Sequence, residues 1–244
     1  MHAAGPGNSC QSSSAARGAG AWLALLLLLA ACAPPRRPPP ATPPAVPLSV
    51  PAASVYRLDP RRSELRILVY RAGPLARFGH NHVIVSRDLA GEVRLAAADS
   101  YAGAEFDVSL PVADLAVDEP AARLQEGADF ATRPTAADID GTRRRLLGPQ
   151  VLDAAAFPTL RVRGTTALLP TGLVARGSFE VHGRATELSV PLSVAAEGDT
   201  LTVGGQFSVS QAALGISPFS VGLGALAVRD EVEVRFRIVA VGSH

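Results

Sequence analysis

The segment at residues 173–194 reads LVARGSFEVHGRATELSVPLSV, and its pattern of apolar side chains decides the fold class. Every second residue is apolar or glycine from 173 to 181, and again from 188 to 194. Successive side chains of a strand point to opposite faces of a sheet, so each run gives a strand with one apolar face. The pair His182-Gly183 between the runs is typical of a tight turn, in which glycine accepts a positive φ. The segment therefore predicts an antiparallel hairpin that must cover its apolar face.

The same alternation recurs along most of the chain and predicts at least eight strands in total. The apolar faces of the other strands are formed by Leu65, Ile67 and Val69; Val93 and Leu95; Phe106, Val108 and Leu110; Leu160 and Val162; Leu201, Val203, Phe207 and Val209; and Val232, Val234, Phe236 and Ile238. Such strands bury their apolar faces as two packed sheets or as one closed sheet, and closure also removes exposed edges. Gly177 and Gly205 stand mid-strand on the apolar face, where a missing side chain leaves room or permits a sharp bend. We therefore expect an all-β antiparallel barrel with interior space.

Alternation stops in the middle of the chain, where helix-forming residues predominate. Residues 135–147 have apolar side chains at helical spacing, with Thr135 or Asp138 as the helix cap. A second short turn is expected at residues 150–156. A further segment without alternation, residues 211–220, precedes the last strand. We expect these segments to lie over a barrel mouth as lids.

The N-terminus has the features of a secretory signal. Arg17 is followed by an unbroken apolar run at residues 21–31, AWLALLLLLAA, which is shorter than the roughly 20 residues that a membrane-spanning helix needs. Residues 29–32, LAAC, resemble the bacterial lipobox, in which the cysteine is lipidated and becomes the first mature residue. The alternative is an ordinary cleavage site beside an incidental cysteine. We predict a signal peptide at residues 1–31 and lipidation at Cys32.

Residues 32–53 are rich in proline, which favours extended conformations over a packed core and predicts a semi-rigid tether. By resemblance to Gram-negative lipoproteins, Ala33 after the lipidated Cys32 favours the outer membrane, on its periplasmic side. Without lipidation the expected location is the periplasm. Residues 54–244 then form one domain, a length that is usual for a single barrel.

Composition limits the chemistry of that domain. The only cysteines are Cys10 and Cys32, so the domain has no disulfide, thiolate metal site or cysteine nucleophile. Twenty of the 23 basic residues, all arginines, lie in the domain together with all 22 acidic residues, so we expect no nucleic-acid partner. The sequence leaves the oligomeric state open.

Four motifs, in this order, resemble the YceI-like family of exported bacterial proteins. They are YRLDP at residues 56–60, LDAAAFPT at 152–159, GSFEVHG at 177–183 and VRDEV at 228–232, and the resemblance covers residues 54–241. It implies a lipocalin-like antiparallel barrel of about eight strands with two short helices. It also implies non-enzymatic binding of a polyisoprenoid or other long amphiphile in an elongated apolar pore.

The implied partners are a hydrophobic small molecule and, through the lipid anchor, the membrane. No cofactor is required, although an isoprenoid quinone or polyprenyl lipid would fit the pore as a bound molecule. We expect the largest apolar side chains of the strands and loops to line it. The predicted pore-lining residues are Phe78, Phe106, Val108, Phe179, Val181, Leu188, Val190, Phe207, Phe219 and Phe236.

Three histidines are candidates for the mouth of the pore or for contact with a ligand head group: His80, His82 and His182. His80 and His82 are two residues apart, so on a strand they share a face, a spacing that suits two ligands of one metal ion. Asp88, Glu180 and His182 are available as further ligands, but nothing in the sequence brings them near. Many relatives have a lone histidine where this chain has both.

The sequence leaves open two alternatives to a protein that binds and carries an amphiphile. One is a metal- or stress-linked envelope protein that uses His80 and His82, and the other is a structural or interaction module whose barrel is filled by its own side chains. Asp114, Asp118 and Glu119 follow a strand, where we expect them to be solvated. With no acid-base pair and no nucleophile motif recognisable, we expect the protein not to be an enzyme.

Overall fold

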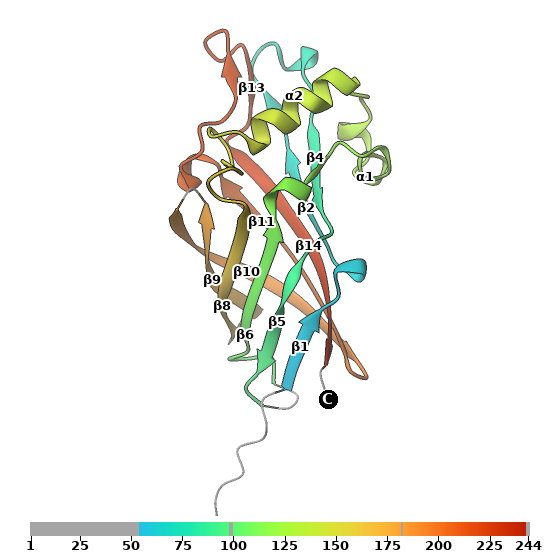
Figure 1. The fold of residues 1–244 in the computed structure, drawn as a ribbon, viewed down its shortest axis with the longest axis vertical. Helices are drawn as coiled ribbons and strands as arrows, with labels where there is room; N and C mark the ends of the chain where they lie inside the picture. The colour runs from blue at the N-terminus through green and yellow to red at the C-terminus, as the bar shows by residue number, and fades with distance from the viewer. Residues whose placement is uncertain (1–53, 98–99, 182, 243–244) are drawn as a thin grey trace, which may run out of the picture. The chain divides into compact units, whose positions relative to one another are not determined.

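The computed structural model describes residues 54–97, 100–181 and 183–242. Eight antiparallel strands form a closed ring in the order β1-β5-β6-β8-β9-β10-β11-β14, which confirms the predicted all-β barrel (Figure 1). These strands are β1 (Ser54–Leu58), β5 (Ala90–Leu95), β6 (Glu105–Pro111), β8 (Thr159–Leu169), β9 (Gly172–Val181), β10 (Arg184–Glu197), β11 (Thr200–Ser210) and β14 (Glu231–Gly242).

Strand β14 closes the barrel because it pairs with β11 along one edge and with β1 along the other, and the two halves of that second edge have different partners. Its C-terminal half pairs with β1, where Tyr56 lies opposite Gly242, and its N-terminal half pairs with β2 (Glu64–Val69), where Leu68 lies opposite Glu233. Beyond β2 the sheet continues into β4 (His82–Ser86) and β7 (Ala116–Val117).

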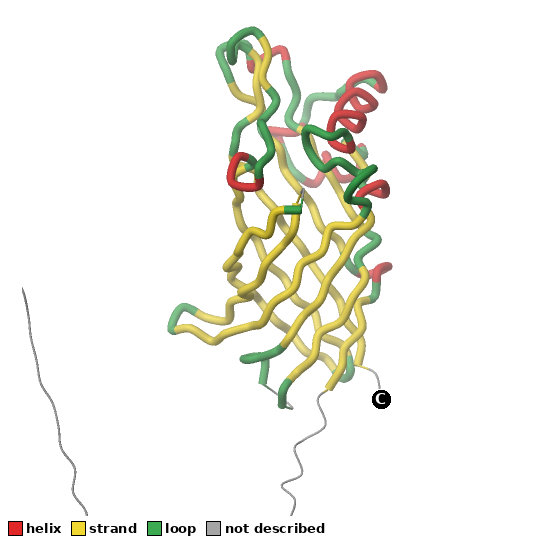
Figure 2. The backbone as a smooth tube through the Cα atoms, turned by 60° about the vertical axis from the view of Figure 1, so that its left-hand side comes forward, coloured by secondary structure: helices red, strands yellow, loops and turns green. Residues whose placement is uncertain are grey.

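A second, three-stranded sheet stands at one end of the barrel. It consists of β12 (Ser220–Val221), β13 (Leu226–Val228) and β3 (Arg71–Ala72). Figure 2 shows it as a narrow projection beyond the strands of the barrel, at the same end as the helices. Short 3-10 helices interrupt the connections: η1 (Pro60–Arg62), η2 (Ala76–Phe78), η3 (Val112–Asp114), η4 (Ala128–Phe130) and η5 (Ala212–Leu214).

Two α-helices lie near this end, α1 (Pro120–Gln125) and α2 (Ala136–Leu147). Helix α2 begins where the sequence predicts, because the hydroxyl of Thr135 accepts from the backbone NH of Asp138 while the Asp138 carboxylate accepts from the backbone NH of Thr135. The second helix is α1, whose first residue is proline, and the predicted short structure at residues 150–156 consists of turns. Among the described residues, no helix is long and apolar enough to cross a membrane.

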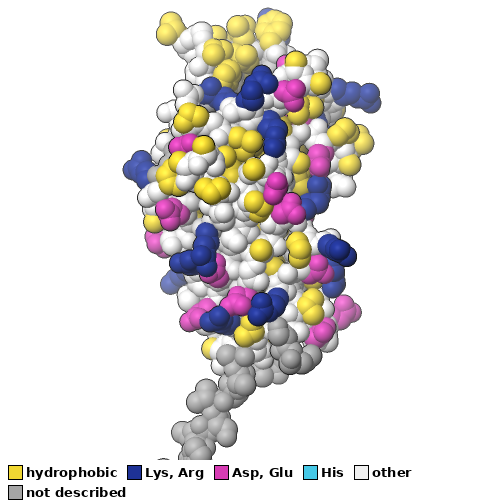
Figure 3. All heavy atoms as spheres, in the orientation of Figure 1, with side chains coloured by type: hydrophobic (Ala, Val, Ile, Leu, Met, Phe, Trp, Pro, Cys, Tyr) yellow, Lys and Arg dark blue, Asp and Glu magenta, His cyan; other side chains and the backbone are white. Residues whose placement is uncertain are grey.

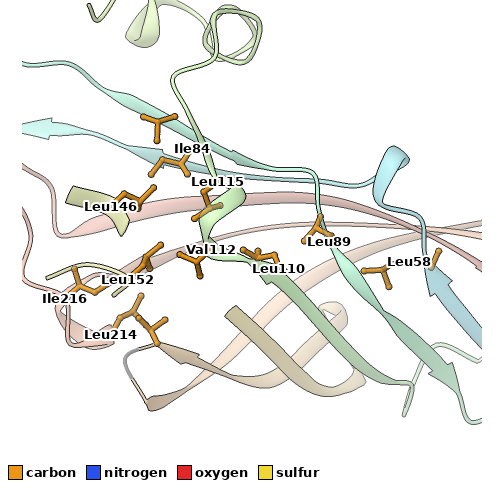
Figure 4. Close-up of a cluster of buried hydrophobic side chains, with 13 residues drawn as sticks. Leu58, Ile84, Leu89, Leu110, Val112, Leu115, Leu146, Leu152, Leu214 and Ile216 are labelled. Carbon is orange, nitrogen blue, oxygen red and sulfur yellow. The ribbon is translucent and has the colours of Figure 1, made fainter. Parts of the chain in front are cut away.

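The buried side chains form separate clusters inside and outside the barrel. The largest lies in the interior near the helical end, where Leu146, Leu152, Leu214 and Ile216 come together with residues of β4 and β6 (Figure 4). A second cluster lies outside the wall, where Leu68, Val83 and Val85 pack against Ala122 and Phe130. Strand β4 is therefore buried on both faces, which removes the alternation by which a strand is recognised.

Candidate ligand-binding cavity

The barrel encloses an elongated cavity of about 290 Å³. Its wall is built from the inward faces of the strands, and all the apolar faces that the sequence predicts contribute to it. On β9, for example, the wall includes Leu173, Ala175, Gly177, Phe179 and Val181, nine residues from first to last. At about 3.3 Å per residue this spans roughly 25 Å along the strand.

The wall has almost no polar character. Among the described residues that line it there is no Asp, Glu, Arg or His, and the polar ones are Tyr101, Ser109, Thr166 and Gln211. The hydroxyl of Thr166 accepts from the backbone NH of Ala104 at 3.0 Å, and the Gln211 amide donates to the carbonyl oxygen of Arg229 at 2.8 Å. Backbone groups thus form hydrogen bonds with two of these four polar side chains. The cavity therefore suits an apolar guest.

The protein's own side chains do not fill this space. Inward residues of β8 such as Leu160 and Val162 are only half-buried, although both point into the barrel. Interior side chains of a close-packed core have no such accessible surface. The self-filled barrel considered from the sequence therefore does not describe this fold.

Three glycines shape the cavity in two different ways. A Cβ on Gly164 or Gly177 would overlap a backbone carbonyl oxygen of the neighbouring strand, so at this point β8 and β9 approach more closely than side chains allow. A Cβ on Gly205 would instead overlap the ring of Phe236, which lies against the wall there. One of the two roles predicted for mid-strand glycines is present, since Gly205 leaves room for a ring, whereas Gly177 permits a close approach of two strands instead of a sharp bend.

Eight of the ten predicted pore-lining residues lie on the wall of the cavity. They are Phe106, Val108, Phe179, Val181, Leu188, Val190, Phe207 and Phe236. Contact of any of them with a ligand stays a prediction.

Phe78 and Phe219 do not belong to this wall, which corrects the expectation that they line the pore. Phe78 lies in η2, beyond the barrel, and is 66% exposed. Phe219 precedes β12 and packs under the guanidinium of Arg145, which lies 4.7 Å from the ring centroid. Both aromatic residues fall outside the strands whose alternation directs side chains inward.

The helical end of the cavity is closed by the two segments that the sequence predicts as lids. The first segment contributes Leu146 at the end of α2 and, from the turns after it, Val151 and Leu152. The second contributes Leu214 of η5 and Ile216, two residues further on. All of these side chains are apolar, so together they form an apolar plug at this end of the cavity, beside Gln211. Tyr101 and Thr166 mark the opposite end.

His82 lies just beyond the cavity, because its strand partner Val69 is part of the wall while His82 itself is not. Its Nδ1 lies 2.6 Å from Oδ2 of Asp118. Asp118 also accepts from the backbone NH of Val83 at 3.0 Å and from the guanidinium of Arg123. Arg123 in turn donates to the carbonyl oxygen of Asn81 at 2.6 Å. These contacts form a buried polar network between β4 and α1.

Asp118 corrects the expectation of a solvated loop residue. It is 2% exposed and has a φ of 55°, a conformation uncommon for residues other than glycine. Burial would raise the pKa of its carboxyl, but the hydrogen bonds from His82, Val83 and Arg123 outweigh burial and hold that pKa below its ordinary value. The residues around Asp118 are typical of a loop, and nothing in them indicates a hydrogen-bond partner 36 residues earlier in the chain.

His80 has a looser environment. Its Nε2 lies 3.7 Å from Oδ2 of Asp138 at the start of α2, and its ring centroid is 6.5 Å from that of His82. Its Nδ1 is buried without a hydrogen-bond partner among the described residues. The third candidate, His182, lies outside the described residues, while Gly183 has the positive φ, 69°, expected of the turn.

No third metal ligand from the described residues joins His80 and His82. Within the described part of the chain, no three side chains of His, Cys, Asp or Glu are placed to hold one metal ion. Glu180 lies on β9 and Asp88 follows β4, and neither joins the two histidines. His82 is instead engaged with Asp118.

Comparisons with known proteins agree with the barrel. Residues 56–240 match the YceI-like domain. The crystal structure of BcnA from Burkholderia cenocepacia is similar, with a TM-score of 0.53 and 18% identity over 75% of this chain and 99% of BcnA. No curated protein matches the sequence.

Two further solved structures have lower scores. A polyisoprenoid binding domain from Saccharophagus degradans, implicated in plant cell wall breakdown, has a TM-score of 0.49 and 14% identity over 77% of this chain and 98% of that one. A YceI protein of Campylobacter jejuni has a TM-score of 0.43 and 9% identity over 64% of this chain and 82% of that one. At such identities the likeness concerns the fold.

Proposed function

The chain belongs to the YceI-like domain family, and we propose that it is a non-enzymatic carrier that holds a long apolar amphiphile, a polyisoprenoid or fatty lipid, inside its barrel. The observation that carries the proposal is the cavity of about 290 Å³, to whose wall the described residues contribute no charged side chain. An open apolar interior is costly for a protein to maintain without a guest, because each unfilled volume forfeits packing contacts.

The physical chemistry of burial favours a slender chain. Each CH₂ group that moves from water into the cavity contributes about 0.8 kcal/mol. About ten such groups give on the order of 8 kcal/mol, which corresponds to a dissociation constant of about 1 μM before the entropic cost of binding is subtracted. The few polar residues at the ends of the cavity, Tyr101 and Gln211, are the wall groups that could orient a polar head.

Native mass spectrometry and solvent extraction of protein purified from its own host test the proposal. We expect a bound molecule with a long apolar chain. Ala175→Phe places a ring in the cavity and should reduce bound ligand, while Ser189→Phe places the same ring on the exposed outer face of the adjacent strand and should leave it unchanged. Thermal melting of both variants shows that the barrel still folds.

An empty wild-type protein that also fails to take up prenyl or fatty probes in solution would contradict the carrier function. Equal ligand content in Ala175→Phe and Ser189→Phe would place the ligand outside the cavity.

We further propose that the carrier works in the bacterial envelope, anchored to the periplasmic side of the outer membrane by a lipid on Cys32. This rests on residues 1–53, which lie outside the described part of the chain. Support comes from the apolar run at residues 21–31 and the LAAC motif that follows. Mass spectrometry of the mature N-terminus should find an acylated Cys32, and a mature chain that begins elsewhere would limit the proposal to the periplasm.

A further inference from the structure

Two segments project together from the helical end of the barrel, residues 70–79 and 217–229, and we call them the tip. They contain β3, η2, β12 and β13. Backbone hydrogen bonds join them, from Leu75 NH to the carbonyl oxygen of Ala225 at 2.8 Å and from Arg229 NH to that of Tyr70 at 2.7 Å. Figure 2 shows the tip standing clear of the barrel strands. It is an ordered projection rather than a pair of independent loops.

The tip exposes large apolar side chains. Phe78 is 66% exposed and Leu223 is fully exposed, at 109%. Leu75 and Val221 are also exposed. Four of the six exposed large hydrophobic residues in the described chain thus lie in these two segments, and Figure 3 shows hydrophobic side chains gathered at this end. Single exposed apolar residues are ordinary, whereas a cluster marks an interaction surface.

Leu223 occupies a position that nothing in the fold requires to be leucine. It lies between Gly222 and Gly224 in the turn from β12 to β13, and its φ is 55°. A leucine is strained in this conformation and gains no burial in return. Its side chain therefore makes no packing contribution to the described fold that would offset this strain.

The charge of the tip is of one sign. Residues 70–79 and 217–229 contain Arg71, Arg77 and Arg229 and no Asp or Glu. None of the three arginines takes part in an ion pair with a described residue. Instead, Arg77 stacks on Phe78 and Arg229 on Tyr70, at 4.5 and 5.2 Å from the ring centroids. Exposed apolar groups among unpaired arginines match the interface of an anionic lipid bilayer.

We propose that the tip docks the barrel onto an anionic membrane surface, with Leu223 and Phe78 entering the interface and Arg77 and Arg229 facing lipid phosphates. The tip stands at the end that Leu214 and Ile216 close, since η5 leads from β11 through these residues into β12. Docking would hold this plug beside the lipid from which an apolar guest comes. The docking proposal does not depend on the carrier function and is tested without a ligand.

Single-cysteine labelling gives a positional test. In the chain from residue 32 onward, which the sequence predicts as the mature form, Cys32→Ser removes the remaining cysteine. Leu223→Cys then carries an environment-sensitive fluorophore, and Leu168→Cys is the matched control. Leu168 is 71% exposed and lies near the end of β8, at the opposite end of the barrel. Vesicles of phosphatidylethanolamine with phosphatidylglycerol, and vesicles of phosphatidylcholine alone, are titrated against each labelled protein.

We expect a blue shift of the fluorophore at position 223, and none at 168, with the anionic vesicles. Removing charge by Arg77→Gln and Arg229→Gln should weaken the binding detected at 223 by about fivefold for each arginine. Neither residue is buried in the barrel, and near-ultraviolet circular dichroism checks that the fold is unchanged.

Three results would overturn the proposal. One is equal shifts at 223 and 168, which would mean that another part of the chain binds the vesicle. Another is no shift at 223 with anionic vesicles. The last is a shift that appears without vesicles and grows with protein concentration, which would identify a second copy of the chain as the partner.

Discussion

At the scale of single residues, the carboxylate of Asp118 joins two elements, β4 and α1. It accepts hydrogen bonds from His82 and Val83 on β4 and from Arg123 on α1. Arg123 is itself 6% exposed and extends the network to the carbonyl oxygens of Phe130 and Thr132, at 2.9 and 2.7 Å. The loop that covers β4 is thus held by charge as well as by its apolar contacts.

Asp118→Asn should destabilise the protein by about 3–5 kcal/mol at pH 7, because it leaves the buried guanidinium of Arg123 without an anionic partner. Urea unfolding followed by circular dichroism measures the change. Asp114→Asn is the matched control, since Asp114 lies four residues earlier on the exposed surface and should change stability by less than about 0.5 kcal/mol. Equal effects of the two substitutions would contradict the network.

The pKa of Asp118 adds a pH dependence with a defined sign. A carboxyl whose folded pKa is depressed stabilises the fold above its unfolded pKa of about 3.9, and this contribution is lost as the pH falls through the lower folded value. The difference in unfolding free energy between wild type and Asp118→Asn should therefore be present at pH 5 and narrow below about pH 4, as the Asp118 carboxylate is protonated. A difference that stays constant down to pH 2 would exclude the carboxylate as its cause.

Two glycines of the barrel strands, Gly164 on β8 and Gly205 on β11, give a second contrast between residues. Gly164→Ala should cost about 1–3 kcal/mol, because its Cβ meets a backbone carbonyl that cannot move aside. Gly205→Ala meets only the ring of Phe236, which can swing into the cavity, so it should cost less stability but reduce ligand capacity. Unfolding curves and ligand stoichiometry on the same two variants measure both effects. The reverse order would mean that the cavity has no room for the ring.

At the scale of elements, the apolar plug at the helical end of the cavity should control how fast a ligand enters and leaves, and not how tightly it binds. Leu214→Ala together with Ile216→Ala removes apolar bulk from one lid while leaving the long walls of the cavity intact. We expect release of a fluorescent fatty probe to be at least tenfold faster, measured by stopped-flow displacement. A cost of several kcal/mol in stability accompanies the change. Unchanged release would indicate that ligands pass through the other end.

The elements that the sequence predicts are those whose local pattern and tertiary role agree. Strands β9 and β10 alternate because one face lines the cavity and the other meets solvent, and α2 begins at its own capping residues. Strand β4 is different, because α1 and η4 cover its outer face and leave Val83, Ile84 and Val85 all buried. Its pattern depends on a covering segment that the strand itself does not encode.

The residues of the candidate site also divide into those that the local pattern predicts and those that it does not. The cavity wall follows from alternation, since inward and outward residues are distinguished by a period of two. The sequence places Phe78 in the pore and Asp118 in solvent, and both predictions are wrong because these positions depend on contacts between distant segments. Hydrophobicity alone does not separate an aromatic residue of the interior from one on an exposed tip, and a carboxylate in a loop sequence gives no sign of a buried cation nearby.

At the scale of the whole molecule, the length of the ligand is the quantity that the cavity limits. A dry cavity of about 150 Å³ lined by aliphatic side chains holds one benzene molecule. By that measure about 290 Å³ accommodates on the order of a dozen carbon atoms, and a longer prenyl or acyl chain must project from one end or displace wall residues.

Affinity should therefore rise with chain length and then level off. In a series of linear prenyl and alkyl alcohols, each added CH₂ should tighten binding about fourfold until roughly 10–16 carbons are buried, after which further carbons add little. Displacement of a fluorescent fatty probe measures the series, with Ala175→Phe as the variant in which the plateau comes earlier. A rise that continues past about 20 carbons at the same slope would mean that the barrel opens around its guest, and no dependence on length would mean that the apolar interior is not where the ligand binds.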